Sequence, residues 1–273
     1  MQCRYDVGTS FGRNVGICCK ESLRKGRARV MEHIRQTPSE HMFSVVVPVL
    51  NEAKRINSLI KNIRGLRSDG FCEIIVVDGD PQGATIQVIQ DKDVVCIISG
   101  KARARQMNSG AAKARGKVLI FLHADTKLPS DALQKIRKVL ENEKYVAGAF
   151  DLGIDSDKLL LKTIAACASL RSRLHRVPYG DQAIFIRRRY FGKIGGFKEI
   201  PLMEDVELMV RIKKRGDSIF ILRDRVITSA RRWQKEGIIY TTLRNIVIRN
   251  LFRFGVSPDR LAKYYKADSM KGN

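Results

Sequence analysis

The chain has 273 residues, 44% of them hydrophobic, which is enough to form the core of one large α/β domain. It contains no apolar run long enough to span a bilayer and no unbroken apolar stretch in its first twenty residues, so we expect a cytoplasmic protein without a signal peptide. Its formal net charge of +23 favours polyanionic partners, namely nucleic acid, anionic lipid headgroups or phosphorylated substrates, without choosing among them.

Residues 1–40 are basic, polar and poor in periodicity, and we expect a weakly structured extension there. A regular alternation of apolar strands and amphipathic helices then begins. The residue patterns predict strands at 43–50, 73–80, 94–99 and 118–122, and helices at 52–66, 83–90, 102–116 and 129–142. Ser130 or Asp131 is expected to cap the last of these helices.

Strands that alternate with helices over short connections indicate a Rossmann-like α/β fold, a mostly parallel sheet with helices on both faces. After residue 145 the alternation loosens, and the patterns predict strands at 146–154 and 218–229 and helices at 157–174, 204–215 and 234–254. We therefore expect one domain at 41–233, followed by C-terminal amphipathic helices at 234–273.

Polar side chains follow the predicted strands at the edge where open parallel sheets bind their ligands. Asn51 and Glu52 follow the first strand, Asp78 the second, and His123 and Asp125 the fourth, in the stretch KVLIFLHADTKLP. His123 and Asp125 are two residues apart, so on an extended chain both could face a divalent cation. The alternative is that Asp125 is only a turn or helix-capping residue.

Basic residues begin the helix at 102–116, where they oppose the helix dipole. The unfavourable interaction with the dipole is offset if a phosphate group binds nearby, because the dipole and the cations would then both attract it. The cations are Lys101, Arg103 and Arg105. The alternative is a solvated basic face.

Acidic residues occupy two further positions of interest. Glu204 and Asp205 stand in the first turn of a predicted helix, either as dipole-favoured caps or as a general base at the lip of a cleft. Asp181 and Gln182 precede an apolar strand pattern, which is a weak signal alone. The carboxylate of Asp78 could accept hydrogen bonds from a base imide or a ribose hydroxyl.

Taken together, these stretches resemble the family 2 glycosyltransferases of the GT-A fold over residues 43–265. VVVPVLNEAKRI, which contains Pro48, resembles the family's opening strand, IIVVDGD its nucleotide-binding strand, HADT its DxD-type motif and MEDVEL its acidic pair. With GKARARQMNSGAAKARG, YGDQAIFIRR and SARRW, the order of motifs resembles a subfamily of small bacterial enzymes described as radical-SAM/selenodomain-associated transferase 2.

The resemblance implies an inverting enzyme that transfers a hexose from a nucleotide-diphosphate sugar to an acceptor hydroxyl with Mg²⁺ or Mn²⁺ as cofactor. It implies a nucleotide-binding half at 41–127 and an acceptor half at 128–233. Asp125 would bind the metal and Asp205 would act as base, with Glu204 as the runner-up. The remaining implied contacts are Pro48, Asn51, Glu52, Asp78, Arg103, Arg105 and His123 for the nucleotide, and Asp181, Gln182, Arg232 and Trp233 for the acceptor.

Three positions depart from the family pattern. His123 replaces the first Asp of the DxD motif, which removes a negative charge from the metal site. Gly83 stands where a second Asp usually follows Asp78. Ser229 replaces the Gln of the Gln-x-x-Arg-Trp motif of processive relatives, which favours a single transfer over polymerisation.

Two other functions are considered. A non-catalytic protein that binds nucleotides or polyanions on a degenerate transferase fold is disfavoured because the basic residues lack interleaved aromatics, and no specific nucleic-acid partner is expected. A nucleotidyltransferase would need a glycine-rich loop after the first strand, and PVLNEAKR has none.

The C-terminal helix has an apolar stripe with arginines off it. The stripe consists of Leu243, Ile246, Val247, Leu251 and Phe254, and the arginines are Arg244, Arg249 and Arg253. It either packs on the catalytic domain or lies on an anionic membrane, as a peripheral enzyme with a lipid-linked acceptor would require.

Overall fold

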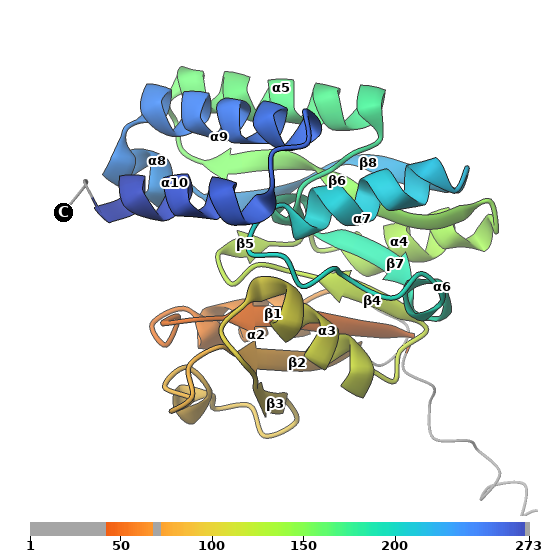
Figure 1. Ribbon diagram of the computed structural model, residues 1–273. Coiled ribbons are helices and arrows are strands. Elements are labelled where there is room, and N and C mark those ends of the chain that lie inside the picture. Colours follow the sequence, from red (N-terminus) through yellow and green to blue (C-terminus); the bar gives the residue numbers. More distant parts are fainter. Residues whose placement is uncertain (1–41, 68–71, 271–273) are drawn as a thin grey trace, which may run out of the picture. The chain divides into compact units, whose positions relative to one another are not determined.

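The computed structural model describes residues 42–67 and 72–270, the last five of these by their backbone alone. The extension expected at 1–40 lies outside the described residues. The described strands form one sheet in the order β3-β2-β1-β4-β7-β6-β8-β5 (Figure 1). Their bounds are β1 Phe43–Val49, β2 Cys72–Asp78, β3 Val95–Ile98, β4 Val118–Phe121, β5 Thr126–Lys127, β6 Tyr145–Asp155, β7 Ile184–Arg187 and β8 Ser218–Ser229.

The sheet is mostly parallel. β1 pairs in parallel with β2 and β4, β2 with β3, and β6 with β8. Antiparallel pairs join β4 to β7, β7 to β6, and β8 to the short β5. The chain moves outward from β1 through β2 to β3 and then returns to place β4 on the other side of β1. The strand order therefore reverses between β1 and β4, which is where sheets of this kind leave room for a ligand.

Helices cover both faces of the sheet, as the sequence predicts. Their bounds are α2 Ile56–Arg64, α3 Arg103–Lys113, α4 Ala132–Glu141, α5 Leu159–His175, α6 Arg188–Lys193, α7 Glu204–Lys214, α8 Arg231–Glu236, α9 Ile238–Arg253 and α10 Pro258–Met270, with single 3₁₀ turns at Ile86–Val88 (η1) and Gly180–Gln182 (η2). Val45 and Val47 of β1 join a core completed by α2, α4 and α5, whereas Val46 joins one completed by α3, α6 and α7. Adjacent strand residues point to opposite faces, so the continuous apolar runs follow from burial on both sides.

A glycine brings α3 close to the sheet. A Cβ at Gly110 would lie 2.4 Å from Cγ1 of Val46 and 3.1 Å from Cγ2 of Val77. No side chain fits this gap, so the glycine sets the distance between α3 and the strands whose ends border the ligand edge.

Two helix predictions need correction. The segment at 83–90 forms only the 3₁₀ turn η1, and the helix predicted at 234–254 is divided into α8 and α9 at Gly237. Gly237 has φ of 88°, which is favourable for glycine and incompatible with a continuing α-helix. Asp131 stands at the N-cap position of α4, but its carboxylate pairs with Lys135 at 2.7 Å and makes no capping hydrogen bond.

The apolar stripe of α9 does not pack on the described domain. Its five residues are 36–84% exposed, whereas Arg244, expected off the stripe, is 7% exposed and pairs with Glu236. The first of the two readings of this helix is therefore wrong. Among the described residues, none of the helices combines the length and the apolar character that a bilayer crossing requires.

Candidate active site

A cavity of about 320 Å³ lies beyond the carboxyl ends of β1 and β4, at the reversal of strand order. The segment after β1, the start of α3, the segment after β4 and the start of α8 surround it. Seven of the side chains singled out in the sequence line it: Pro48, Glu52, Lys101, Arg103, His123, Asp125 and Arg232. Gln106 and Arg231 complete its polar wall. The site thus combines one face rich in cations with two carboxylates.

Arg231 links the two carboxylates of the cavity. Its guanidinium lies 3.3 Å from Oε1 of Glu52 and 3.3 Å from Oδ2 of Asp125. Glu52 also accepts a hydrogen bond from Arg55 at 3.0 Å. Asp125 is held from behind, because Ser229 donates its backbone N–H to the carbonyl oxygen of Asp125 at 3.1 Å. The start of α8 therefore positions both acids.

The loop after β2 is built around Asp78. The carboxylate of this fully buried residue accepts the backbone N–H groups of Asp80 and Thr85, each at 3.0 Å. Gln106 of α3 joins the ends of β1 and β2 by donating its amide to the carbonyl oxygens of Val49 at 2.7 Å and Val77 at 2.8 Å. Asp78 does not line the cavity, and its carboxylate shapes the turn beside it.

The acidic pair of α7 approaches the cavity through a glycine. Gly180 donates its N–H to Oδ2 of Asp205 at 2.6 Å, and a Cβ at Gly180 would lie 2.9 Å from Nε2 of His123. No larger residue fits between them. Val206 donates to Oδ1 of Asp205 at 2.7 Å, so both carboxylate oxygens are oriented by backbone groups. The acid pair and the cavity therefore belong to one site.

Glu204 lies deeper than Asp205. It is 3% exposed, and its Oε1 is 3.5 Å from the guanidinium of Arg103. Burial raises the pKa of Glu204, the charge of Arg103 opposes this, and Asp205 raises the pKa further. Glu204 therefore holds Arg103 in place at the cavity wall, and Asp205 is the more accessible acid.

Two further groups of the site have strongly shifted pKa values. Burial lowers the pKa of His123 to about 3, with contributions from Arg103 and Arg232, so its imidazole is neutral at physiological pH. Burial raises the pKa of Asp181 to about 6, and Asp205 adds to the effect. A neutral imidazole keeps a lone pair for a ligand, and a carboxyl near pH 6 can exchange a proton.

The remaining predicted residues lie outside this cavity. Asn51 has a left-handed backbone with φ of 58° and is exposed, and Arg105 pairs with Glu199 at 3.1 Å on the surface. Gln182 is fully buried, where it bonds Ser172, the N–H of Tyr179 and the carbonyl of Phe150. A direct acceptor contact by Gln182 is not supported by this placement. Asp181 and Trp233 line a second, mostly apolar groove between α5 and α9.

The described residues contain no group of three or more His, Cys, Asp or Glu side chains placed to hold a metal ion. The cavity does offer a smaller donor set, the carboxylate of Asp125 and the neutral imidazole of His123. A divalent ion that also binds diphosphate oxygens and water needs no more than one or two protein ligands. These residues therefore fit a metal–diphosphate complex better than a free ion.

Three residues near the site, Arg231, Arg171 and Tyr179, are not predicted from the sequence. Arg231 stands beside Arg232 in SARRW, and its pairing with Glu52 spans 179 positions, which no local pattern reveals. Arg171 of α5 stacks on Tyr179, the residue before η2, with its guanidinium 3.6 Å from the ring centroid. The absence of acidic residues from the helix that contains Arg171 is a sequence signal that could have indicated an anion-binding role for it.

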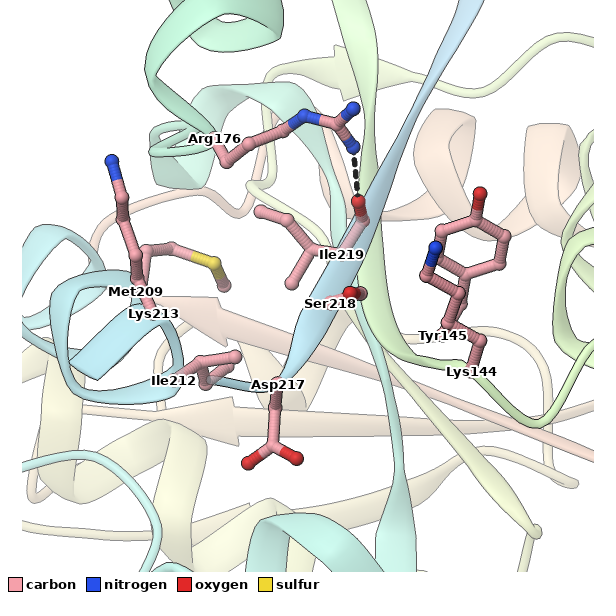
Figure 2. A pocket seen from close by; sticks show the side chains of 9 residues that line it. All are labelled: Lys144, Tyr145, Arg176, Met209, Ile212, Lys213, Asp217, Ser218 and Ile219. Atoms are coloured by element: carbon pink, nitrogen blue, oxygen red, sulfur yellow. Dashed lines mark hydrogen bonds between the residues drawn. The ribbon is translucent and has the colours of Figure 1, made fainter. Parts of the chain in front are cut away.

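A separate hollow of about 170 Å³ lies at the other edge of the sheet (Figure 2). It is bordered by Tyr145 and Ser218, the first residues of the parallel strands β6 and β8. Arg176 crosses it to donate to the carbonyl oxygen of Ile219 at 2.6 Å, as the dashed line in Figure 2 marks. It carries none of the residues singled out above.

The fold and the cavity define an α/β protein with its ligand site at the switch point of the sheet. The family model described as glycosyl transferase family 2 matches residues 44–198, more than half of the chain, and the chain belongs to this family. "Probable glycosyltransferase YdaM" of Bacillus subtilis (strain 168) is 25% identical over 228 residues, which cover 75% of this chain and 52% of that protein. The chain therefore spans about half the length of this curated relative.

Solved structures confirm the GT-A fold. The mannosyltransferase PcManGT from Pyrobaculum calidifontis, in complex with GDP-Man and Mn²⁺, superposes with a TM-score of 0.61 at 17% identity, covering 89% of this chain and 77% of that one. Residues 1–349 of S. aureus TarS in complex with UDP give a TM-score of 0.53 at 17% identity, covering 77% and 65%.

Proposed function

We propose that the chain is an inverting glycosyltransferase that moves a hexose from a nucleotide-diphosphate sugar to an acceptor hydroxyl. The observation that carries the proposal is the contact at Gly180, which places the acid Asp205 next to His123 of the cationic cavity. The cations of the cavity could then stabilise the leaving group on one side of the site, and Asp205 could remove the acceptor's proton on the other. The nucleotide and the nucleotide sugar in the two solved structures support the class of donor.

The donor's diphosphate is assigned to the cavity at the switch point. Lys101, Arg103 and Arg232 line it, and Arg231 is held there by Glu52 and Asp125. Preorganised cations of this kind stabilise the charge that develops on the leaving group. A bound Mg²⁺ or Mn²⁺, with Asp125 and neutral His123 as its protein ligands, would supply Lewis-acid stabilisation of the same charge. The Mn²⁺ in the mannosyltransferase complex supports this cofactor.

The acceptor is assigned to the side of Asp205. Its hydroxyl oxygen attacks the anomeric carbon from the face opposite the diphosphate, which inverts the configuration. The C–O bond to the diphosphate breaks with its electron pair on the diphosphate oxygen, and the hydroxyl proton goes to the carboxylate of Asp205. The N–H groups of Gly180 and Val206 fix that carboxylate in place before the reaction.

On this proposal residues 41–127 would supply most of the nucleotide site and residues 128–233 the acceptor site. Arg231 and Arg232 cross this division, because they line the cavity assigned to the diphosphate, whereas the sequence pattern had placed Arg232 with the acceptor. Gln182 positions η2, because its three internal hydrogen bonds hold the turn that presents Gly180 and Asp181.

Asp205→Asn tests the assignment of the base. We expect turnover of a nucleotide sugar to fall by about 100-fold or more with little change in donor affinity. Glu207→Gln is the matched control, because Glu207 lies in the same helical turn and pairs with Arg211 at 2.9 Å. Near-wild-type turnover in Asp205→Asn would contradict the role of Asp205. Nucleotide binding without any turnover in the wild type would favour the non-catalytic alternative.

A further inference from the structure

The faces of α5 and α9 that point to solvent are apolar. Eleven of the sixteen large hydrophobic residues exposed in the described part of the chain lie on these two helices or directly after α9. They are Leu159, Leu160, Leu170 and Leu174 on α5, and Ile239, Tyr240, Leu243, Ile246, Val247, Leu251 and Phe254 on or after α9. The two helices contact each other and lie together at the top of Figure 1. Apolar surface concentrated in this way marks an interaction site.

Neither helix contains an acidic residue. The 17 residues of α5 and the 16 of α9 carry six Lys or Arg residues and no Asp or Glu. Arg173 pairs with Asp151 and the buried Arg244 with Glu236, and Lys162 is exposed beside Asp157. Arg171, Arg249 and Arg253 form no salt bridge within the described part of the chain. A basic apolar surface is complementary to an anionic one and repels a second copy of itself. The chemistry therefore favours an anionic membrane over self-association.

A groove of about 470 Å³ runs between the two helices toward the site. Thr163 and Cys167 of α5 and Ile246 of α9 line its outer part, and Asp181 and Trp233 line its inner end. Oδ1 of Asp181 and Nε1 of Trp233 are both buried without a hydrogen-bond partner. Unsatisfied buried polar atoms are costly, so the inner end is suited to a ligand with polar groups and the outer part to an apolar chain.

Two arginines stand unneutralised where this groove meets a larger cleft of about 780 Å³. Arg171 and Arg249 line both spaces, and neither makes a salt bridge within the described part of the chain. Arg171 stacks on Tyr179 and donates to Oγ of Ser172 at 3.2 Å. Burial lowers the pKa of Arg171 and the charge of Arg249 lowers it further, while Tyr179 and Asp181 act in the opposite direction. Asp181 lines the same groove but forms no salt bridge with either arginine, so the pair is suited to bind an anionic group.

We propose that α5 and α9 bind an anionic membrane and that the groove between them receives an anionic lipid, its headgroup against Arg171 and Arg249. As the acceptor, this lipid would present its hydroxyl near Asp181 and Asp205 for the transfer described above. The acceptor role rests on the proposed function. The membrane contact rests only on the exposed apolar and basic surface.

Co-sedimentation of the full chain with phosphatidylcholine vesicles that contain increasing fractions of phosphatidylglycerol tests the proposal. Binding should rise with the anionic fraction and weaken in high salt. The double variant Leu170→Ser, Leu243→Ser should bind at least about tenfold more weakly, because each exposed leucine loses its contact with lipid. Ile98→Ser is the matched control, since Ile98 on β3 and Leu243 are both 56% exposed.

The arginine pair is tested on the same vesicles. Arg171→Gln combined with Arg249→Gln should lower binding to anionic vesicles by about fivefold or more for each arginine and leave binding to neutral vesicles unchanged. Arg189→Gln on α6, an exposed arginine away from the groove, is the control. Equal losses in the pair and in the control would overturn the assignment of the headgroup site.

Three results would overturn the proposal. These are absence of vesicle binding, binding indifferent to lipid charge, and a dimer in sedimentation velocity that Leu243→Ser dissolves. Donor binding measured by calorimetry with the same preparations separates this proposal from the proposed function. Donor turnover without vesicle binding would refute the membrane contact alone, whereas vesicle binding of the expected pattern without donor binding would support it and refute the enzyme.

Discussion

Replacing Asp181 by Asn should change how the stability of the protein depends on pH. Burial, with Asp205 and Asp125, raises the pKa of Asp181 to about 6, while Arg171 and Arg232 act in the opposite direction. Because the folded pKa lies above the unfolded one, the native state holds this proton more tightly. Asp181 therefore contributes most to stability at acidic pH, and that contribution is lost as the pH rises through about 6.

The size of the effect follows from the pKa difference. The pKa of Asp181 rises from its ordinary value of 3.8 to about 6 in the folded protein, and each unit of pKa corresponds to about 1.36 kcal/mol. The ionisation of Asp181 therefore lowers the free energy of unfolding of the wild type by up to about 3 kcal/mol as the pH rises through this range. Asn resembles the protonated acid and has no proton to lose. The stability of Asp181→Asn relative to wild type should therefore increase by up to about 3 kcal/mol between pH 4 and pH 7.5.

Urea unfolding followed by circular dichroism in chelator-containing buffer at several pH values measures this difference. Asp157→Asn is the control, because it makes the same chemical change at a fully exposed side chain. A constant offset for Asp181→Asn as well would show that Asp181 titrates normally and would refute the reasoning from burial.

Three further outcomes are expected. Asp125→Ala should abolish the Mn²⁺-dependent part of nucleotide-sugar affinity in calorimetry, and unchanged affinity with and without Mn²⁺ would remove Asp125 as a metal ligand. Gly110→Ala should lower the free energy of unfolding by about 1–3 kcal/mol because its Cβ would overlap Val46, whereas Gly192→Ala, with nothing within 4 Å, should cost little. Glu73→Gln should cost about 1–3 kcal/mol at neutral pH, because the carboxylate accepts hydrogen bonds from Ser44, Arg115 and Gly116, whose combined effect outweighs burial and lowers its pKa. That loss should shrink as the pH falls from the ordinary value of 4.5 through the lowered pKa that Glu73 has in the folded protein. A loss that does not change with pH would contradict this account.

The amino-acid sequence by itself determined the α/β alternation and the edge at which the ligand site forms. Runs of β-branched residues bounded by turns predict the strands from local sequence alone. Because open parallel sheets bind ligands at the carboxyl ends of their strands, the predicted strands also predict that His123 and Asp125 lie at the ligand site. Both line the cavity, as do Glu52 and Arg103. The family motifs supplied the same positions independently, and the family model confirms the membership they indicated.

Tertiary structure alone decided which side chains turn toward the site. Asp181 and Gln182 are adjacent polar residues that the sequence does not distinguish. The amide of Gln182 forms hydrogen bonds with Ser172 and Phe150 in the core, whereas Asp181 has an oxygen without a hydrogen-bond partner in the groove. Arg231 reaches Glu52 across 179 positions of sequence. The direction of the α9 stripe was likewise undetermined, because periodicity shows that a helix has an apolar face but not what that face meets. That depends on where α5, α8 and α9 pack, and the turn at Gly237 places the stripe in solvent and Arg244 inside.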